Sequence, residues 1–183
     1  MRDKKTTDLV IFGLLVAIGV AGRWGQPDWC VTPIAAVTLL AGYWFGRPAV
    51  AAVVPLLVML ISDLALDGYQ NFGVMALVYL AMAAPAVLGV WLRTGDGVGW
   101  WAKLVTCSLI PATVFWLTSN FAVWAWSTQP YYEKTLGGLL QCYTMAVPFF
   151  GRMMAGDLAF TLVLFGAMLM AGAGRVVKSR VAT

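Results

Sequence analysis

An asparagine lies between two tryptophans at a spacing of four residues, in a stretch that otherwise has the composition of a membrane-spanning helix. This spacing places Trp116, Asn120 and Trp124 on one face of a helix. An amide in hydrocarbon is costly unless it has a hydrogen-bond partner. Asn120 therefore either bonds a neighbouring helix or faces a cavity that holds a ligand, and the flanking rings suit a flat heteroaromatic ligand. An aromatic belt at the membrane interface is the alternative explanation of the tryptophans.

Charged residues form the second group of candidates for ligand binding. Asp63 and Asp67 are four residues apart and share a face if the helix before them continues, although capping and turn formation explain them better. Arg152 and Asp157 are five residues apart, which is a poor spacing for a pair on one helix. They either form an ion pair at the start of the last helix or contact a ligand. Tyr79 adds a further ring on which a substrate could stack.

Several kinds of chemistry are excluded by residues that the sequence lacks. It contains no histidine, which removes the usual general base, the histidine-containing metal sites and the common nucleophile pairs. The stretch 172–179 lacks the second glycine of a phosphate-binding loop. We therefore expect no catalytic residues, no cofactor and no metal site. Cys30 and Cys142 could still pair as a disulfide or as soft metal ligands, although a role as small packing residues explains them better.

Small residues recur every four positions near the start of the chain, at Gly13, Ala17 and Ala21. They form a flat ridge that favours close helix contact, either within the bundle or with a partner protein. The basic start and the apolar run that follows also resemble a cleaved signal peptide, which is the alternative for this segment.

The composition indicates the elements that must position these residues. Of 183 residues, 61% are apolar and 11% are charged, which is too apolar for a soluble domain of this size. We predict one all-α integral membrane domain over 1–183, a bundle of six transmembrane helices. The predicted spans are 8–22, 32–45, 48–62, 73–92, 100–126 and 153–173. The apolar segment 135–150 is interrupted by proline and is too short to cross twice, so we expect an interfacial or re-entrant helix before the last span.

The basic residues predict the orientation of this bundle. An even number of spans places both termini on one side of the membrane. Nine of the twelve basic residues fall on that side, which makes it cytoplasmic, and three fall on the other. The three are Arg23, Lys134 and Arg152. The basic residues form no stripe of the kind that binds nucleic acid. The predicted outer segments 23–31, 63–72 and 127–150 are longer and chemically more varied than the cytoplasmic loops.

Taken together, these features resemble the substrate-binding S components of energy-coupling-factor vitamin transporters, which are small six-helix bacterial membrane proteins. That family typically carries an Ala-x-x-x-Ala ridge in its first helix, and here the pattern reads Ala17-Ile18-Gly19-Val20-Ala21. The resemblance implies cytoplasmic termini in a bacterial inner membrane and a ligand site near the outer face. It also implies partners, namely a transmembrane coupling protein that docks on the first helix and cytoplasmic ATPases.

The chain is also similar to an uncharacterised group of small bacterial integral membrane proteins. The similarity covers nearly the whole chain and implies no substrate. The segments that carry it are TPIAAVTLLAGYWFG (32–46), PLLVMLISD (55–63), TSNFAVW (118–124), GLLQCYTMAVPFF (138–150) and GD (156–157).

Three hypotheses of function follow. The leading one is a binding subunit for uptake of a vitamin-like micronutrient, whose substrate stacks on the aromatic residues and is fixed by Asn120, Arg152 and the outer carboxylates. The second is a structural or assembly subunit of a larger membrane complex. The third is an intramembrane enzyme that acts on lipid or isoprenoid through Asp63, Asp67 and Asp157, which the absence of catalytic motifs argues against.

Overall fold

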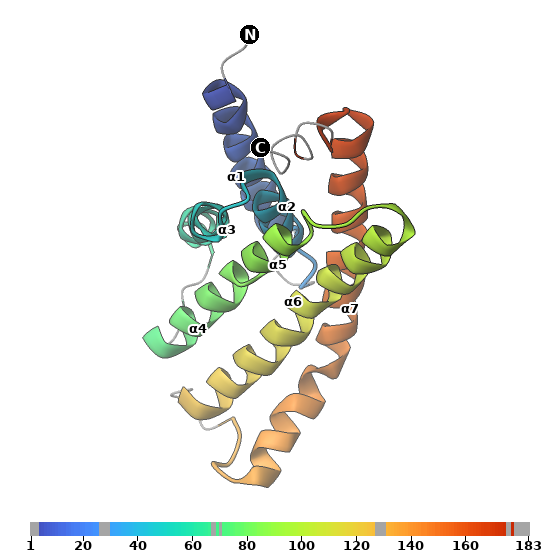
Figure 1. The fold of residues 1–183 in the computed structure, drawn as a ribbon. Coiled ribbons are helices and arrows are strands. Elements are labelled where there is room, and N and C mark those ends of the chain that lie inside the picture. The colour runs from blue at the N-terminus through green and yellow to red at the C-terminus, as the bar shows by residue number, and fades with distance from the viewer. Residues whose placement is uncertain are drawn as a thin grey trace.

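The computed structural model describes residues 4–25, 30–66, 69, 71–126, 131–174 and 177. Within these ranges the regular elements are helices (Figure 1). In chain order they are α1 (Lys4–Gly25), α2 (Ile34–Phe45), α3 (Pro48–Ser62), α4 (Phe72–Ala83), α5 (Pro85–Trp91), α6 (Gly97–Trp126) and α7 (Leu136–Met170). The start of α1 and the end of α7 lie at the same end of the molecule (Figure 1).

Four helical stretches are long and apolar enough to cross a membrane. They are Lys4–Gly25, Phe72–Trp91, Gly97–Trp126 and Leu136–Met170. The prediction of an all-helical protein with membrane-compatible helices is thus confirmed. Six crossings would additionally require α2 and α3, whose 12 and 15 residues are fewer than a straight crossing needs.

Proline breaks one predicted span and leaves another helix intact. The predicted span 73–92 is divided into α4 and α5 at Pro85, because proline lacks an N–H and clashes with the preceding turn. In contrast, α7 continues through Pro148 for 35 residues. The structure therefore has one helix where the sequence predicted a separate interfacial or re-entrant helix over 135–150. Neighbouring helices can compensate for a proline in a membrane helix, which explains why the residue type alone does not define the boundary.

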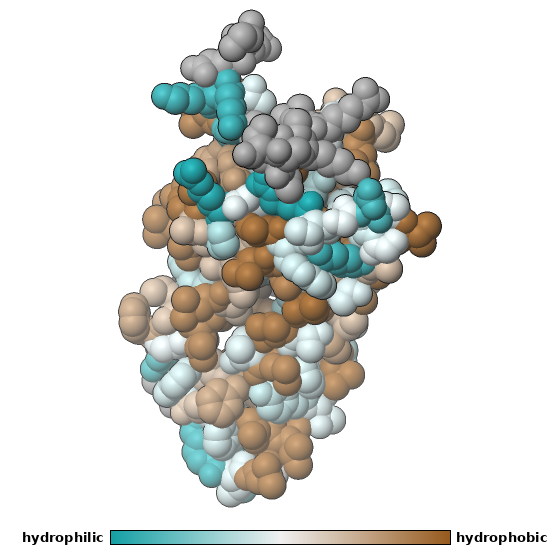
Figure 2. All heavy atoms as spheres, in the orientation of Figure 1, coloured by the Kyte–Doolittle hydropathy of each residue, from teal (hydrophilic) through white to brown (hydrophobic). Residues whose placement is uncertain are grey.

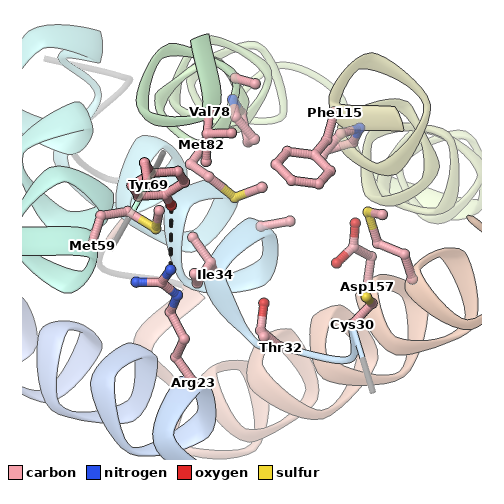
Figure 3. A pocket seen from close by; sticks show the side chains of 15 residues that line it. Arg23, Cys30, Thr32, Ile34, Met59, Tyr69, Val78, Met82, Phe115 and Asp157 are labelled. Carbon is pink, nitrogen blue, oxygen red and sulfur yellow. Dashed lines mark hydrogen bonds between the residues drawn. The ribbon is translucent and has the colours of Figure 1, made fainter. Parts of the chain in front are cut away.

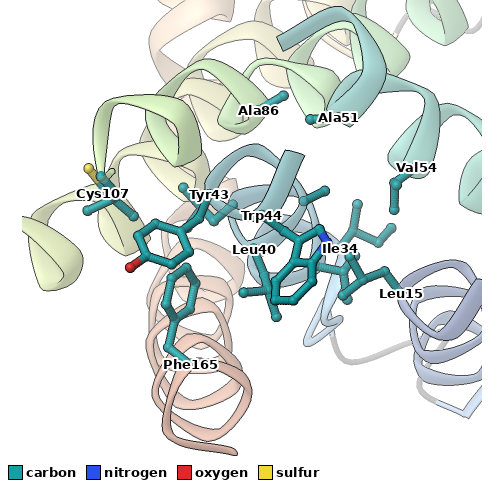
Figure 4. Close-up of a cluster of buried hydrophobic side chains, with 14 of the residues drawn as sticks. Leu15, Ile34, Leu40, Tyr43, Trp44, Ala51, Val54, Ala86, Cys107 and Phe165 are labelled. Carbon is teal, nitrogen blue, oxygen red and sulfur yellow. The ribbon is translucent and has the colours of Figure 1, made fainter. Parts of the chain in front are cut away.

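The short helix α2 forms the centre of the bundle. Eleven of its twelve residues are buried, and it packs against α1, α3, α5 and α7. Figure 4 shows Tyr43 and Trp44 of α2 projecting to opposite sides, toward Phe165 of α7 and Leu15 of α1. The rings of Tyr43 and Phe165 are 5.5 Å apart in an edge-on arrangement. A helix that is apolar on all sides is expected in such a position.

Two glycines allow α2 and α5 to pack backbone against backbone. A Cβ atom added to Gly42 would lie 2.2 Å from the carbonyl oxygen of Ala86, and one added to Gly89 would lie 2.1 Å from that of Leu39. These distances are far shorter than any van der Waals contact, and the obstructing atoms are backbone. The contact therefore requires glycine on both helices, as in close helix crossings of other membrane proteins.

Hydrophobic side chains cover broad areas of the surface between its two ends (Figure 2). Hydrophilic residues gather near the start of α1 and the α5–α6 connection, and again toward the α6–α7 connection at the opposite end (Figure 2). Many large apolar side chains are exposed, among them Leu9, Leu80 and Val163. An apolar band between polar ends is the distribution that a bilayer stabilises.

The glycine contact predicts the effect of a single methyl group. Replacing Gly89 by alanine should lower the unfolding midpoint in detergent, at a cost of about 1–3 kcal/mol from overpacking. The matched control is Gly151→Ala in α7, where an added Cβ meets nothing within 4 Å. There the same change should be neutral or stabilising by roughly 0.5–1 kcal/mol. Equal midpoints for the two variants, measured by thermal size-exclusion chromatography, would refute this account of the α2–α5 contact.

Candidate functional site

A cavity of about 260 Å³ lies at the N-terminal end of α2 (Figure 3). Its walls come from every helix of the described chain, from the segment that joins α1 to α2, and from Tyr69 between α3 and α4. Most of the lining is apolar, from Ile34, Met59, Val78, Met82 and Phe115 among others. A few polar groups converge on this apolar space, which is the usual composition of a small-molecule site.

Arg23 organises the hydrogen bonds at one end of the cavity. It forms an ion pair with Asp63, and both side chains are largely buried, at 17% and 16% exposed. Its guanidinium also donates to the hydroxyl of Ser62 at 2.6 Å and to that of Tyr69 at 3.4 Å (Figure 3). The hydroxyl of Tyr79 donates to the second oxygen of Asp63 at 2.6 Å. The charge of Asp63 is thus matched by Arg23, and both of its oxygens are bonded.

This network joins three helices near the cavity. Arg23 lies in the last turn of α1, Asp63 caps the end of α3 and Tyr79 belongs to α4. The indole N–H of Trp24 adds a bond to the carbonyl of Ser62 at 3.1 Å. Burial raises the pKa of the Tyr69 hydroxyl, against the opposing effect of Arg23, so this group stays protonated at neutral pH.

Asp157 of α7 lies at the other end of the cavity and has no counter-ion among the described residues. It is 5% exposed, and its carboxylate has no hydrogen-bond or ion-pair partner among the described residues. Figure 3 shows the carboxylate directed into the cavity. Gly156 allows this placement, because its missing side chain leaves room for Val31: an added Cβ would lie 2.8 Å from that residue. A buried carboxylate without a partner is costly unless something else compensates its charge.

Cys30 lies on the wall beside Asp157 (Figure 3). It is exposed, and its φ of 55° falls in the left-handed region that non-glycine residues seldom adopt. Partial burial raises the pKa of its thiol, and the positive charge of Arg152 opposes this shift. Cys30 and Cys142 are free thiols in the structure, and Cys142 is buried elsewhere. Arg152 itself is exposed and forms no ion pair with Asp157.

The predicted face of Trp116, Asn120 and Trp124 contacts α7 and the turn before it. The side-chain amide of Asn120 donates to the backbone carbonyl of Trp116 at 2.7 Å in its own helix. The thiol of Cys142 in α7 donates to the backbone carbonyl of Asn120 at 3.5 Å and to its side-chain oxygen at 3.8 Å. The indole N–H of Trp124 donates to the carbonyl of Glu133 at 2.9 Å. The structure thus places Asn120 against a neighbouring helix, which was one of the two alternatives for it.

Trp116 packs against α7, but one hydrogen-bond donor of its side chain has no partner in the described chain. Its ring stacks on Phe150 at 5.0 Å and lies 4.9 Å from Tyr143, both in α7. Its indole N–H is buried without an acceptor among the described residues. Neither Trp116 nor its two predicted companions lines the cavity. Their role in ligand binding therefore stays a prediction, separate from the site at Asp157.

The small-residue ridge lies on the exposed side of α1. Gly13, Ala17 and Ala21 are exposed and line a shallow apolar groove with residues of α3 such as Leu57 and Ile61. Other glycines of α1 carry the contacts within the bundle: an added Cβ at Gly19 would lie 2.5 Å from Val58. The structure thus leaves the ridge available, while its role as a docking surface stays a prediction.

The predicted site residues therefore fall into separate groups. Asp157 lines the cavity, and Asp63 and Tyr79 bond each other behind its wall. Asp67 lies outside the described residues. Arg23 and Phe115 line the cavity although the sequence did not indicate them as site residues. Arg23 carried a signal, because it is one of only three basic residues on the predicted outer side and follows an apolar span directly.

The Arg23–Asp63 pair can be tested by removing one charge. Asp63→Asn leaves the arginine without its counter-charge and should cost about 1–3 kcal/mol, seen as a lower unfolding midpoint. The exposed Glu133 provides the matched control, because Glu133→Gln changes net charge equally and removes no buried pair. Adding Arg23→Gln to Asp63→Asn should recover part of the loss, since the unpaired charge is then gone. Additive losses in this double variant would contradict the pairing.

Comparisons with known proteins give a family but no activity. No curated protein and no solved structure matches the chain. Residues 3–179 match a family whose description reads "Family of unknown function (DUF6580)". Because the match covers nearly the whole sequence, the chain belongs to the DUF6580 family.

Proposed function

We propose that this protein is a membrane-embedded binding subunit for the uptake of a small, vitamin-like micronutrient, and that a separate module supplies the energy. The observation that carries the proposal is the cavity at the end of α2, into which Asp157 projects a buried carboxylate without a partner in the described chain. An ionisable residue inside a membrane bundle is costly to keep and commonly marks a ligand pathway or site. A ligand would supply the missing partner.

The position of the cavity along the bundle supports an outward-facing site. Arg23, Cys30 and Tyr69 on its walls belong to segments that the distribution of basic residues assigns to the outer side. The arrangement we propose has six crossings, with α2 and α3 as short, protein-flanked crossings and both termini in the cytoplasm. The membrane would be the bacterial inner membrane, as in the S components of vitamin transporters that the sequence resembles.

The dimensions of the cavity limit the ligand. A volume of about 260 Å³ lies just below the roughly 300–1,000 Å³ of typical ligand pockets. The proposed ligand is therefore small, no larger than a compact ring system with a short substituent. No described group of three or more acidic or cysteine side chains is placed to hold a metal ion. An organic molecule thus suits the lining better than a bare divalent cation.

The exposed ridge of α1 supports the second half of the proposal. Gly13, Ala17 and Ala21 present a surface without bulky side chains in the middle of an apolar groove. Small residues let another transmembrane helix approach closely, and van der Waals packing then drives association. We propose a helix of a transmembrane coupling protein as the occupant, with cytoplasmic ATPases bound to that protein.

The test of the binding function uses the exposed thiol of Cys30 as a reporter. Mass spectrometry of molecules released from the gently purified protein should identify a bound small molecule. Restoring it should slow alkylation of Cys30 by N-ethylmaleimide, because Cys30 lines the cavity. The reaction needs the thiolate, so it should accelerate toward alkaline pH, where a thiol of raised pKa ionises.

Cys107 and Cys142 are buried and should react slowly with N-ethylmaleimide. The variant Cys30→Ser should therefore lack the fast phase of alkylation. A protein that releases no small molecule, and whose Cys30 reacts at one rate with every candidate compound present, would overturn the binding function.

Docking is tested separately from binding. Ala17→Leu places a bulky side chain on the ridge and should reduce uptake by cells at least about tenfold, while ligand affinity of the purified protein stays unchanged. Ala167→Leu is the matched control, because Ala167 is also an exposed helical alanine, on α7. Equal uptake by the two variants, at equal amounts of protein in the membrane, would argue against the ridge as the docking surface.

A further inference from the structure

The chemical class of the ligand can be inferred from the charges around the cavity. At one end, the positive charge of Arg23 is matched by Asp63. At the other end, Asp157 is 5% exposed and has no cation within ion-pair distance in the described residues. The exposed Arg152, five residues earlier in α7, does not pair with it. The described lining is thus left with one buried acidic group that has no partner, and a cation entering the cavity would stabilise its ionised form.

Resting on the function proposed above, we infer that this site takes an organic cation, a small molecule whose primary or secondary ammonium group is bound by the carboxylate of Asp157. A buried ion is stable only with a counter-ion and hydrogen bonds, and an ammonium group supplies both to a carboxylate. A ligand with one positive charge makes the cavity neutral when it is occupied.

The groups around Asp157 suit the apolar part of such a ligand. Figure 3 shows the ring of Phe115 and the carboxylate of Asp157 facing the same end of the cavity. A cation placed there is attracted by the face of the ring as well as by the carboxylate. Met82 and Met153 also line the cavity, and their flexible thioethers adapt to the shape of an apolar body. The hydroxyl of Thr32, two residues after Cys30 in the same segment, offers a further polar contact.

A metal cation is a poorer occupant of this end. Sodium and divalent ions need several oxygen ligands at close range, whereas the neighbours of Asp157 are aromatic, thioether and thiol groups. The described residues contain no cluster of three metal-ligating side chains. Direct hydrogen bonds to an ammonium group need fewer protein oxygens than a dehydrated metal ion does.

The experiment compares pairs of probes that differ only in charge. The probes are alkyl and arylalkyl amines, from methylamine to 2-phenylethylamine and tryptamine, each paired with the alcohol of the same skeleton. Binding is read from the slowed alkylation of Cys30 by the uncharged N-ethylmaleimide. We expect at least one amine to bind about tenfold or more tightly than its alcohol, because the carboxylate gains a counter-ion only from the amine.

Asp157→Asn keeps the shape of the side chain and removes its charge, so it should abolish the preference for the amine. Asp96→Asn is the matched control, because Asp96 is exposed in the α5–α6 connection and the same change there should leave the preference intact. If Asp157→Asn does not fold, Phe115→Leu takes its place. That variant should weaken binding of the amine several-fold and affect the alcohol less.

Two results would overturn the inference. One is equal protection by amines and alcohols, or protection by neither series. The other is an amine preference that survives Asp157→Asn. A neutral or anionic molecule that is released from the purified protein and protects Cys30 would refute the ammonium class and leave the binding function standing. Failure of every compound to bind would refute both.

Discussion

The close contact between α2 and α5 is the constraint on which the rest of the structure depends. Gly42 and Gly89 bring the two backbones together, and α2 is consequently enclosed by other helices on all sides. With 12 residues, α2 is only about 18 Å long, whereas the hydrocarbon core of a bilayer is about 30 Å thick. The central helix is therefore shorter than its neighbours, and the cavity lies beyond its N-terminal end, in space that α2 does not fill.

The two acidic residues near this cavity differ in whether other residues of the bundle bond their carboxylates. Asp63 ends α3 at the boundary of the bundle, where Arg23 from α1 and Tyr79 from α4 reach both of its oxygens. Asp157 lies within α7, and no hydrogen bond or ion pair reaches it from the described residues. Ion pairs and hydrogen bonds make the first carboxylate part of the structure. The second has no such partner in the described chain, and under the proposed function a ligand supplies it, so that the two ends of one cavity would serve stability and recognition separately.

The sequence pointed to site residues where a residue type is costly in a membrane. It was less informative where contacts between helices determine which residues lie together. Asp63 and Asp157 could be singled out because carboxylates among apolar residues need an explanation, and both lie at the cavity or directly behind its wall. The helical face that carries Asn120 could be predicted from the sequence, but the helix that packs against this face could not. The packing partner depended on α7 continuing through Pro148, so that Cys142 and Phe150 belong to one long helix beside α6. The Gly42–Gly89 contact joins residues 47 positions apart, and neither glycine has a local signature that distinguishes it from the others.

The first helix connects the binding site with the proposed docking surface because its faces have different neighbours. Gly19 packs directly on Val58 of α3, and Arg23, one turn later, turns toward the cavity. Gly13, Ala17 and Ala21 repeat every four residues and therefore stay on one side, which is exposed. At about 100° per residue, Ala21 and Arg23 point roughly 160° apart, so the ridge and the side chain that lines the cavity lie on nearly opposite sides of α1. A partner bound along this ridge would thus contact the same helix whose last turn fixes Asp63 and Tyr69 at the cavity.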